Sequence, residues 1–181
     1  MPYIENYFGD YMQPKITNAQ RKVSFALSED YTASLYGDIE SPGIIQYHHL
    51  LVIHGPEKEP CLFFCSEWSG ADPSYKDQPI LGVFSEHGHD SYDESVNWLD
   101  DALFVLGAFE LAREILHLEN SGMAEGEAWA ITEILKRIQR PSDDEELVRH
   151  RSGYEAALRK NDESIAEYMK SALSAQPPAA Y

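Results

Sequence analysis

The sequence is 181 residues long, with 43% hydrophobic and 25% charged residues, a composition typical of one globular domain that can bury a core. Its 14 Lys and Arg residues stand against 31 Asp and Glu residues, so the formal net charge is −17. This balance argues strongly against nucleic-acid binding, which needs clustered cations, and against adhesion to an anionic membrane. It favours a soluble protein that attracts a basic partner.

The first segment, residues 1–20, contains aromatic side chains without a regular period, and we expect it to form an N-terminal arm. It has no basic region followed by an apolar one, so no secretory signal is predicted. No apolar run reaches the roughly 18 residues of a membrane span. The expected location is therefore the cytoplasm.

The segment at 21–90 has the pattern of a β-sheet. Apolar and polar residues alternate from Lys22 to Ser28, which is the period of a half-buried strand. Further segments are rich in β-branched and aromatic residues and are bounded by turn residues. We expect an antiparallel meander of about five strands, at 22–28, 31–36, 44–54, 62–68 and 80–87.

Both cysteines, Cys61 and Cys65, fall around the fourth of these strands. Four residues of extended chain place them about 13 Å apart, which is too far for a disulfide in one straight strand. Free cysteine is among the most buried side chains. We expect both to be reduced core residues.

The segment at 91–173 has the pattern of helices, three to four in number. Ser91 and Glu94 match a capping box, which predicts a helix that continues to about residue 118 and packs across the sheet. A second helix is predicted at 127–140, and a further helical region follows. The tail at 174–181 is expected to be disordered.

Strands followed by helices indicate the α+β class and argue against a parallel βαβ sheet. We therefore expect a single α+β domain at 21–173, with the sheet at 21–90 and the helices at 91–173.

Two histidines, His87 and His89, could bind one transition metal if they lay on the same face of a strand, with a third ligand from elsewhere. The alternative interpretation is that residues 87–90 are the polar end of a strand that turns into a capped helix. The negative chain disfavours a reactive Cys65 thiolate, and no phosphate-binding glycine loop is found. No cofactor is predicted.

Acidic side chains mixed with aromatic ones follow several of the predicted strands. Such a mixture suits a surface for a basic partner, because aromatic groups supply buried contact area and carboxylates supply association rate and register. The alternative is a solvated acidic rim with Trp68 packed inward. The candidate partner-binding residues are Glu57, Glu59, Glu67, Trp68, Asp72, Tyr75, Asp77, Glu86, Asp90, Asp93 and Glu94.

The pattern that joins Tyr36–Gly37–Asp38, the strand at 63–68 and the helix with Trp98 and Leu99 resembles bacterial immunity proteins of polymorphic or type VI secretion toxins. It is most similar to those paired with restriction-endonuclease-fold nuclease toxins. The resemblance implies that the protein is not an enzyme and that it binds a cognate toxin one to one. The toxin is expected to have a basic surface, and the free protein is expected to be a monomer or homodimer. The alternatives are a small metal-dependent enzyme that uses His87 and His89, and an adaptor whose helices bind other proteins.

Overall fold

The computed structural model describes residues 13–69, 79–92, 96–118, 125–138, 145–161 and 163, and for residues 145–152 it describes the backbone alone. The predicted tail at 174–181 lies outside this part of the chain, as do residues 1–12 of the predicted arm. The predicted end of that arm at residue 20 was wrong, because Asn18 already belongs to the first strand.

Six strands form one sheet in the order of the sequence, and every neighbouring pair is antiparallel. Three helices follow, so the predicted α+β class is confirmed, with six strands where about five were expected. The strands are β1 Asn18–Ala26, β2 Thr32–Glu40, β3 Gln46–His54, β4 Pro60–Trp68, β5 Ile80–Ser85 and β6 Gly88–Tyr92.

The sixth strand corrects the prediction for residues 87–90. Glu86 and His87 form the turn of a tight hairpin in which Ser85 pairs with Gly88, whose φ of 116° suits glycine. Residues 88–92 then continue as a strand and do not enter a helix. This strand is polar because it forms an edge of the sheet, where one row of hydrogen-bonding groups has no neighbouring strand.

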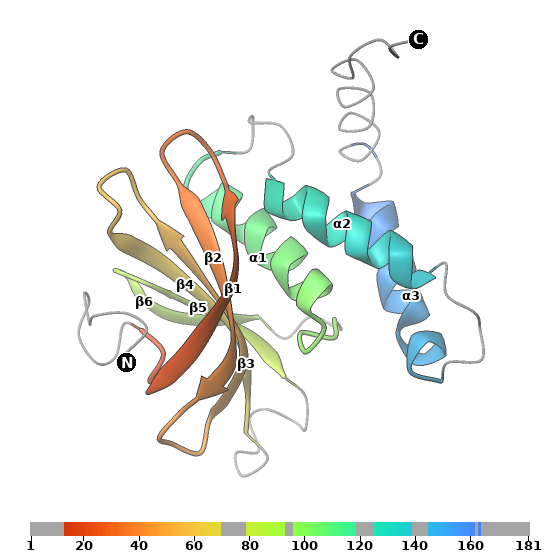
Figure 1. Ribbon diagram of the computed structural model, residues 1–181, viewed down its shortest axis with the longest axis horizontal. Coiled ribbons are helices and arrows are strands. Elements are labelled where there is room, and N and C mark those ends of the chain that lie inside the picture. Colours follow the sequence, from red (N-terminus) through yellow and green to blue (C-terminus); the bar gives the residue numbers. More distant parts are fainter. Residues whose placement is uncertain are drawn as a thin grey trace, which may run out of the picture.

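The helices are α1 Asp101–Ile115, α2 Glu125–Ile138 and α3 Glu145–Lys160. In Figure 1, α1 lies along the sheet, and α2 and α3 lie beyond it on the same side. The capping box predicted at Ser91 and Glu94 was wrong, since Ser91 belongs to β6. The N-cap is Asp100, whose Oδ1 accepts a hydrogen bond of 2.9 Å from the backbone N–H of Leu103.

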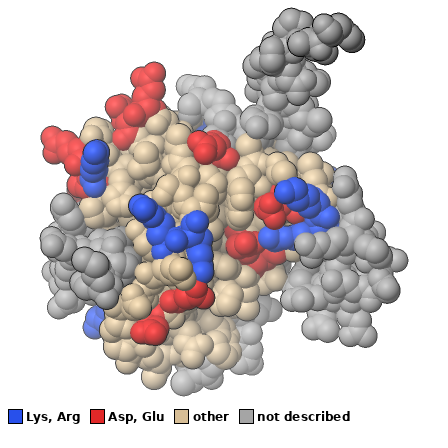
Figure 2. Space-filling model, in the orientation of Figure 1, with Lys and Arg blue, Asp and Glu red and all other residues tan. Residues whose placement is uncertain are grey.

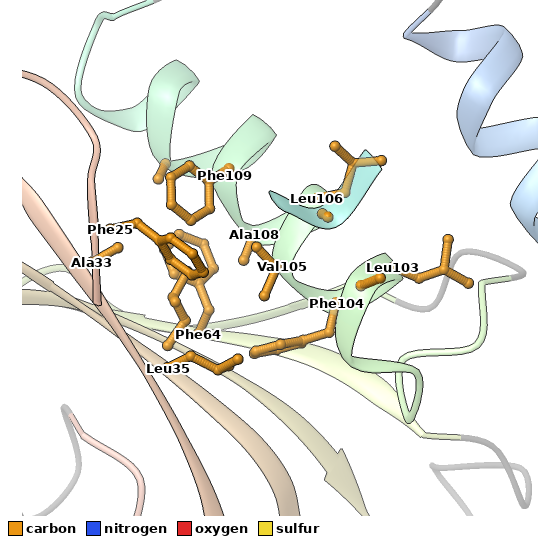
Figure 3. Packing of buried hydrophobic residues seen from close by; sticks show 14 of the residues in the cluster. Phe25, Ala33, Leu35, Phe64, Leu103, Phe104, Val105, Leu106, Ala108 and Phe109 are labelled. Atoms are coloured by element: carbon orange, nitrogen blue, oxygen red, sulfur yellow. The ribbon is translucent and has the colours of Figure 1, made fainter. Parts of the chain in front are cut away.

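The main core lies between the sheet and α1. Aromatic and aliphatic side chains of α1, including Phe104, Val105 and Phe109, face Phe25 and Phe64 of the strands (Figure 3). The rings of Phe25 and Phe109 meet edge to face with centroids 6.0 Å apart. Leu103 and Leu106 point away from the sheet toward the other helices, so α1 is covered on two sides.

The opposite face of the sheet has a smaller apolar cluster. Its members come from four strands and are almost fully buried, and Ile16, before β1, packs against them. Cys65 belongs to this cluster and is fully buried, while Cys61 is half-buried; both are free thiols, as expected. The cluster consists of Tyr36, Leu50, Val52, Phe63, Cys65 and Phe84.

A polar network joins the three helices. Arg137 of α2 donates to both oxygens of Asp100, at 3.0 and 2.8 Å, and to Asp101 at 2.6 Å. The hydroxyl of Tyr154, from α3, donates to the same Asp100 carboxylate. Asp100 therefore caps α1 and also fixes α2 and α3 against it.

Candidate functional site

The meander separates the predicted partner-binding residues into two groups. Glu57 and Glu59 lie in the β3–β4 turn and Glu86 in the β5–β6 turn, at one end of the sheet. Trp68 ends β4 at the opposite end, about 25 Å away at the rise of an extended strand. Asp90 lies on the edge strand β6. Asp72, Tyr75, Asp77, Asp93 and Glu94 lie outside the described residues.

Glu67 was predicted on the surface and is instead fully buried. Its Oε1 accepts a hydrogen bond from the Cys65 thiol at 3.3 Å and lies 2.8 Å from Nε2 of His89. Gly82, on the neighbouring strand, leaves the space that this carboxylate fills, since a Cβ there would stand 1.9 Å from Oε1. A carboxylate in such a position is part of the internal structure of the free protein and does not offer its charge to a partner.

The two histidines of the predicted metal site lie in different surroundings. His87 is exposed in the hairpin turn, while His89 is bonded to Glu67 and stacks on Phe84 with ring centroids 4.1 Å apart. The hydrogen bond to Glu67 raises the pKa of His89. Among the described residues, no three His, Cys, Asp or Glu side chains come together as a set of metal ligands.

The reactivity of Cys65 is also settled by its surroundings. Burial raises the pKa of the Cys65 thiol well above its usual value, and the nearby Glu67 carboxylate raises it further. The thiol is therefore protonated and serves as a hydrogen-bond donor in the core. Burial likewise raises the pKa of Cys61 to about 11.

A β-bulge shapes the end of the sheet that carries Trp68. Tyr47 pairs with Glu67 and Leu50 with Cys65, so His48 and His49 stand opposite the single residue Ser66. The Ser66 hydroxyl accepts a 2.8 Å hydrogen bond from the backbone N–H of His49. The bulge places His49 against α1, with its ring stacked on Phe104, and leaves His48 exposed.

His49 ties the bulge to the segment before α1. Its Nε2 lies 2.8 Å from the carbonyl oxygen of Leu99, and its ring centroid lies 5.5 Å from that of Phe104. Burial lowers the pKa of His49, which favours the neutral ring. A carbonyl can only accept, so Nε2 of the neutral ring carries the proton and donates it. This bond holds Leu99 in place beside β3.

Two adjoining hollows lie along this end of the sheet, and we call them together the end groove. The first, of about 770 Å³, is lined by Trp68, Leu99 and Pro79. The second, of about 830 Å³, is lined by Lys22, Asp101 and Trp129. The hollows share Ile39, Glu40, Tyr47 and His48.

The first hollow has apolar side chains exposed to solvent. Trp68 is 36% exposed and Leu99 44%, and Ile44, in the turn that borders this hollow, is 71% exposed. The other large apolar side chains exposed in the described part of the chain, Ile115 and Leu135, lie on α1 and α2. Exposed Trp beside aliphatic side chains supplies the anchor area that protein interfaces use.

The face of the molecule drawn in Figure 2 shows acidic and basic side chains side by side, with Lys and Arg over the strands and near the carboxyl end of α2. Lys22 is paired with Asp38, and Arg137 with Asp100 and Asp101. These cations are therefore already engaged. The net charge of the whole chain is −17, so the electrostatic field around the protein is negative overall.

Sequence reasoning named Trp68 as a candidate contact, with inward packing as the alternative, and it did not point to Leu99, Ile44 or the bulge at His48 and His49. Trp98 is 4% exposed and belongs to the core. The bulge was not readable, since it depends on the pairing of β3 with β4.

In comparisons with known proteins, no family model, curated protein or solved structure matches this chain. None of the helices in the described residues is long and apolar enough to cross a membrane.

Proposed function

We propose that this chain is an immunity protein, which binds a basic protein toxin one to one and neutralises it through the end groove. The observation that carries the proposal is the exposure of Trp68, Leu99 and Ile44 together at one end of the sheet. The chain that carries them has a net charge of −17. Apolar anchors in an acidic protein suit a partner whose binding surface is basic around an apolar centre. A nuclease is basic where it meets phosphate.

The geometry also favours direct, preformed recognition. Trp68 ends a central strand, and Leu99 is fixed by the hydrogen bond from His49, so neither side chain stands on a free loop. Anchors held in this way lose little conformational freedom when they bind. We expect their removal to weaken binding by the 2 kcal/mol or more that is typical of interface hot spots, which is about 30-fold.

The experiment starts with capture of partners by the tagged full-length chain from its native cells. Each captured basic protein is then expressed alone to test whether it arrests growth, and together with this chain to test whether growth is restored. The proposal expects one captured protein that is toxic alone and harmless in the co-expressed pair. Captured proteins that leave growth unchanged when expressed alone would overturn it.

The site is tested in the same rescue assay with exposed apolar residues as a matched set. Trp68→Ala and Leu99→Ser should lose rescue, whereas Leu135→Ser, which alters an equally exposed side chain on α2, should retain it. Circular dichroism of each variant verifies that the fold is kept. Equal rescue by all three variants would place the interface away from the end groove.

A further inference from the structure

The second hollow of the end groove combines an aromatic ring with carboxylates. Trp129 of α2 lines it and is held by Phe25, with ring centroids 5.5 Å apart. Asp38 and Glu40 of β2 and Asp101 of α1 line the same hollow. Asp38 and Glu40 are exposed, and the Asp101 side chain is 37% exposed.

The charges in this hollow do not balance. Among its described lining residues the one Lys or Arg is Lys22, whose ammonium is paired with Asp38. Three carboxylates against the ammonium of Lys22 and the guanidinium of Arg137 leave a formal charge of −1. Arg137 donates to Asp101 at 2.6 Å from outside the hollow and uses one of its two oxygens.

An aromatic face beside several carboxylates suits a guanidinium group. Arginine stacks on tryptophan and at the same time donates up to five hydrogen bonds to carboxylates, whereas lysine offers a compact charge with three donors. Because the two hollows share Glu40, Tyr47 and His48, one extended segment can reach both of them.

We infer that the second hollow receives an arginine side chain of the basic partner, while an apolar side chain of the same segment lies on Trp68 and Leu99. This inference rests on the proposed function and adds the chemistry of the partner's binding segment. Three residues that line the hollow are held by the core, since Leu35 belongs to it and Val23 and Trp129 pack against it. The ring of Trp129 is therefore in place before a partner binds.

The test uses N-acetyl-arginine methylamide as the probe and the citrulline analogue, which has nearly the same shape and no charge, as its control. Binding is followed by the indole N–H signals of the three tryptophans in NMR spectra of the full-length chain. The arginine probe should shift the Trp129 signal in a saturable way and leave Trp98, which is buried, unchanged. The citrulline analogue should bind at least about tenfold more weakly, since it lacks the charge-assisted hydrogen bonds.

Two pairs of substitutions separate the local effect from overall charge. Asp38→Asn with Glu40→Gln should weaken the arginine probe about tenfold or more, and the backbone is kept because asparagine tolerates the φ of 49° at position 38. Glu57→Gln with Glu86→Gln removes the same charge at the other end of the sheet and should leave the affinity unchanged.

Equal binding of both probes, or an equal effect of both pairs of substitutions, would overturn the inference. So would a Trp129 signal that does not move. These outcomes leave the proposed function to be judged by the rescue assay, because that assay depends on Trp68 and Leu99 and on no arginine probe.

Discussion

The contact between Gly82 and Glu67 gives a sharp prediction for stability. A Cβ at position 82 would stand 1.9 Å from Oε1 of Glu67 and 2.5 Å from Cδ, so the carboxylate would have to move by more than about 1 Å to reach van der Waals distance. The Glu67 side chain is fully buried and has no solvent to move into. The same oxygen lies 2.8 Å from Nε2 of His89, so a shift of this size disturbs that contact as well.

The cost of Gly82→Ala can be worked from these contacts. Overpacking of a filled site costs about 1–3 kcal/mol, and loss of a hydrogen bond to a charged group costs about 1.5–3 kcal/mol. Replacing glycine by alanine returns about 0.4–1 kcal/mol through the unfolded chain. We therefore expect Gly82→Ala to lower the free energy of unfolding by about 2–5 kcal/mol.

A double-mutant cycle tests the cause. In a Glu67→Ala background the obstructing carboxylate is absent, so Gly82→Ala should cost nothing or stabilise slightly. The two substitutions should therefore couple by about 2–5 kcal/mol. Urea unfolding followed by tryptophan fluorescence gives each free energy of unfolding. Gly43→Ala, where a Cβ meets no atom within 4 Å, is the control and should be nearly neutral. An equal cost of Gly82→Ala in both backgrounds would refute the reasoning.

Three further predictions concern the ionisable groups. Asp100→Ala removes the N-cap of α1 and leaves Arg137 and Tyr154 without their shared acceptor. Thermal unfolding should show that the free energy of unfolding falls by about 3–5 kcal/mol, and a fall of less than about 1 kcal/mol would contradict this role. Burial raises the pKa of Tyr154 to about 12. The stability that this residue adds is therefore complete below about pH 10 and falls by roughly 3 kcal/mol as the pH rises to 12. A titration followed at 295 nm in which all described tyrosines of the folded protein ionise together near pH 10 would count against it. The hydrogen bond to Glu67 raises the pKa of His89, so the stabilisation from this pair is complete below about pH 6.5 and is lost as the pH rises through the raised pKa. The difference in unfolding free energy between the native chain and His89→Gln should shrink over that window. A difference independent of pH would show that the pair is uncharged.

Much of the fold could be predicted from the sequence, because most strands and the helices carry their own hydrophobic period. The sixth strand could not, since Gly88–Tyr92 is an edge strand with exposed polar side chains and no apolar alternation. The start of α1 was also misplaced. Trp98 is apolar and buried like the helix residues that follow it, although it precedes the true N-cap at Asp100.

Of the candidate site, the sequence indicated Trp68 as a possible contact and left open whether it packs inward. The structure leaves Trp68 partly exposed. Glu67, one residue earlier, was misassigned because its burial depends on Gly82 and His89, which lie 15 and 22 residues further along the chain. A sequence pattern shows that a residue is charged. The partner that compensates the cost of burying that charge is known only once the strands are paired.

The order of the strands has a consequence for how quickly the protein is ready after synthesis. Each strand pairs with the strand that precedes or follows it in the sequence, so the sheet needs no contact that waits for a distant part of the chain. Folds built from such short-range pairings close their loops at low entropic cost and form quickly, one hairpin after another. The end groove requires β1 to β4 together with α1 and α2. None of its described lining residues belongs to α3, so the groove can form before the last helix docks.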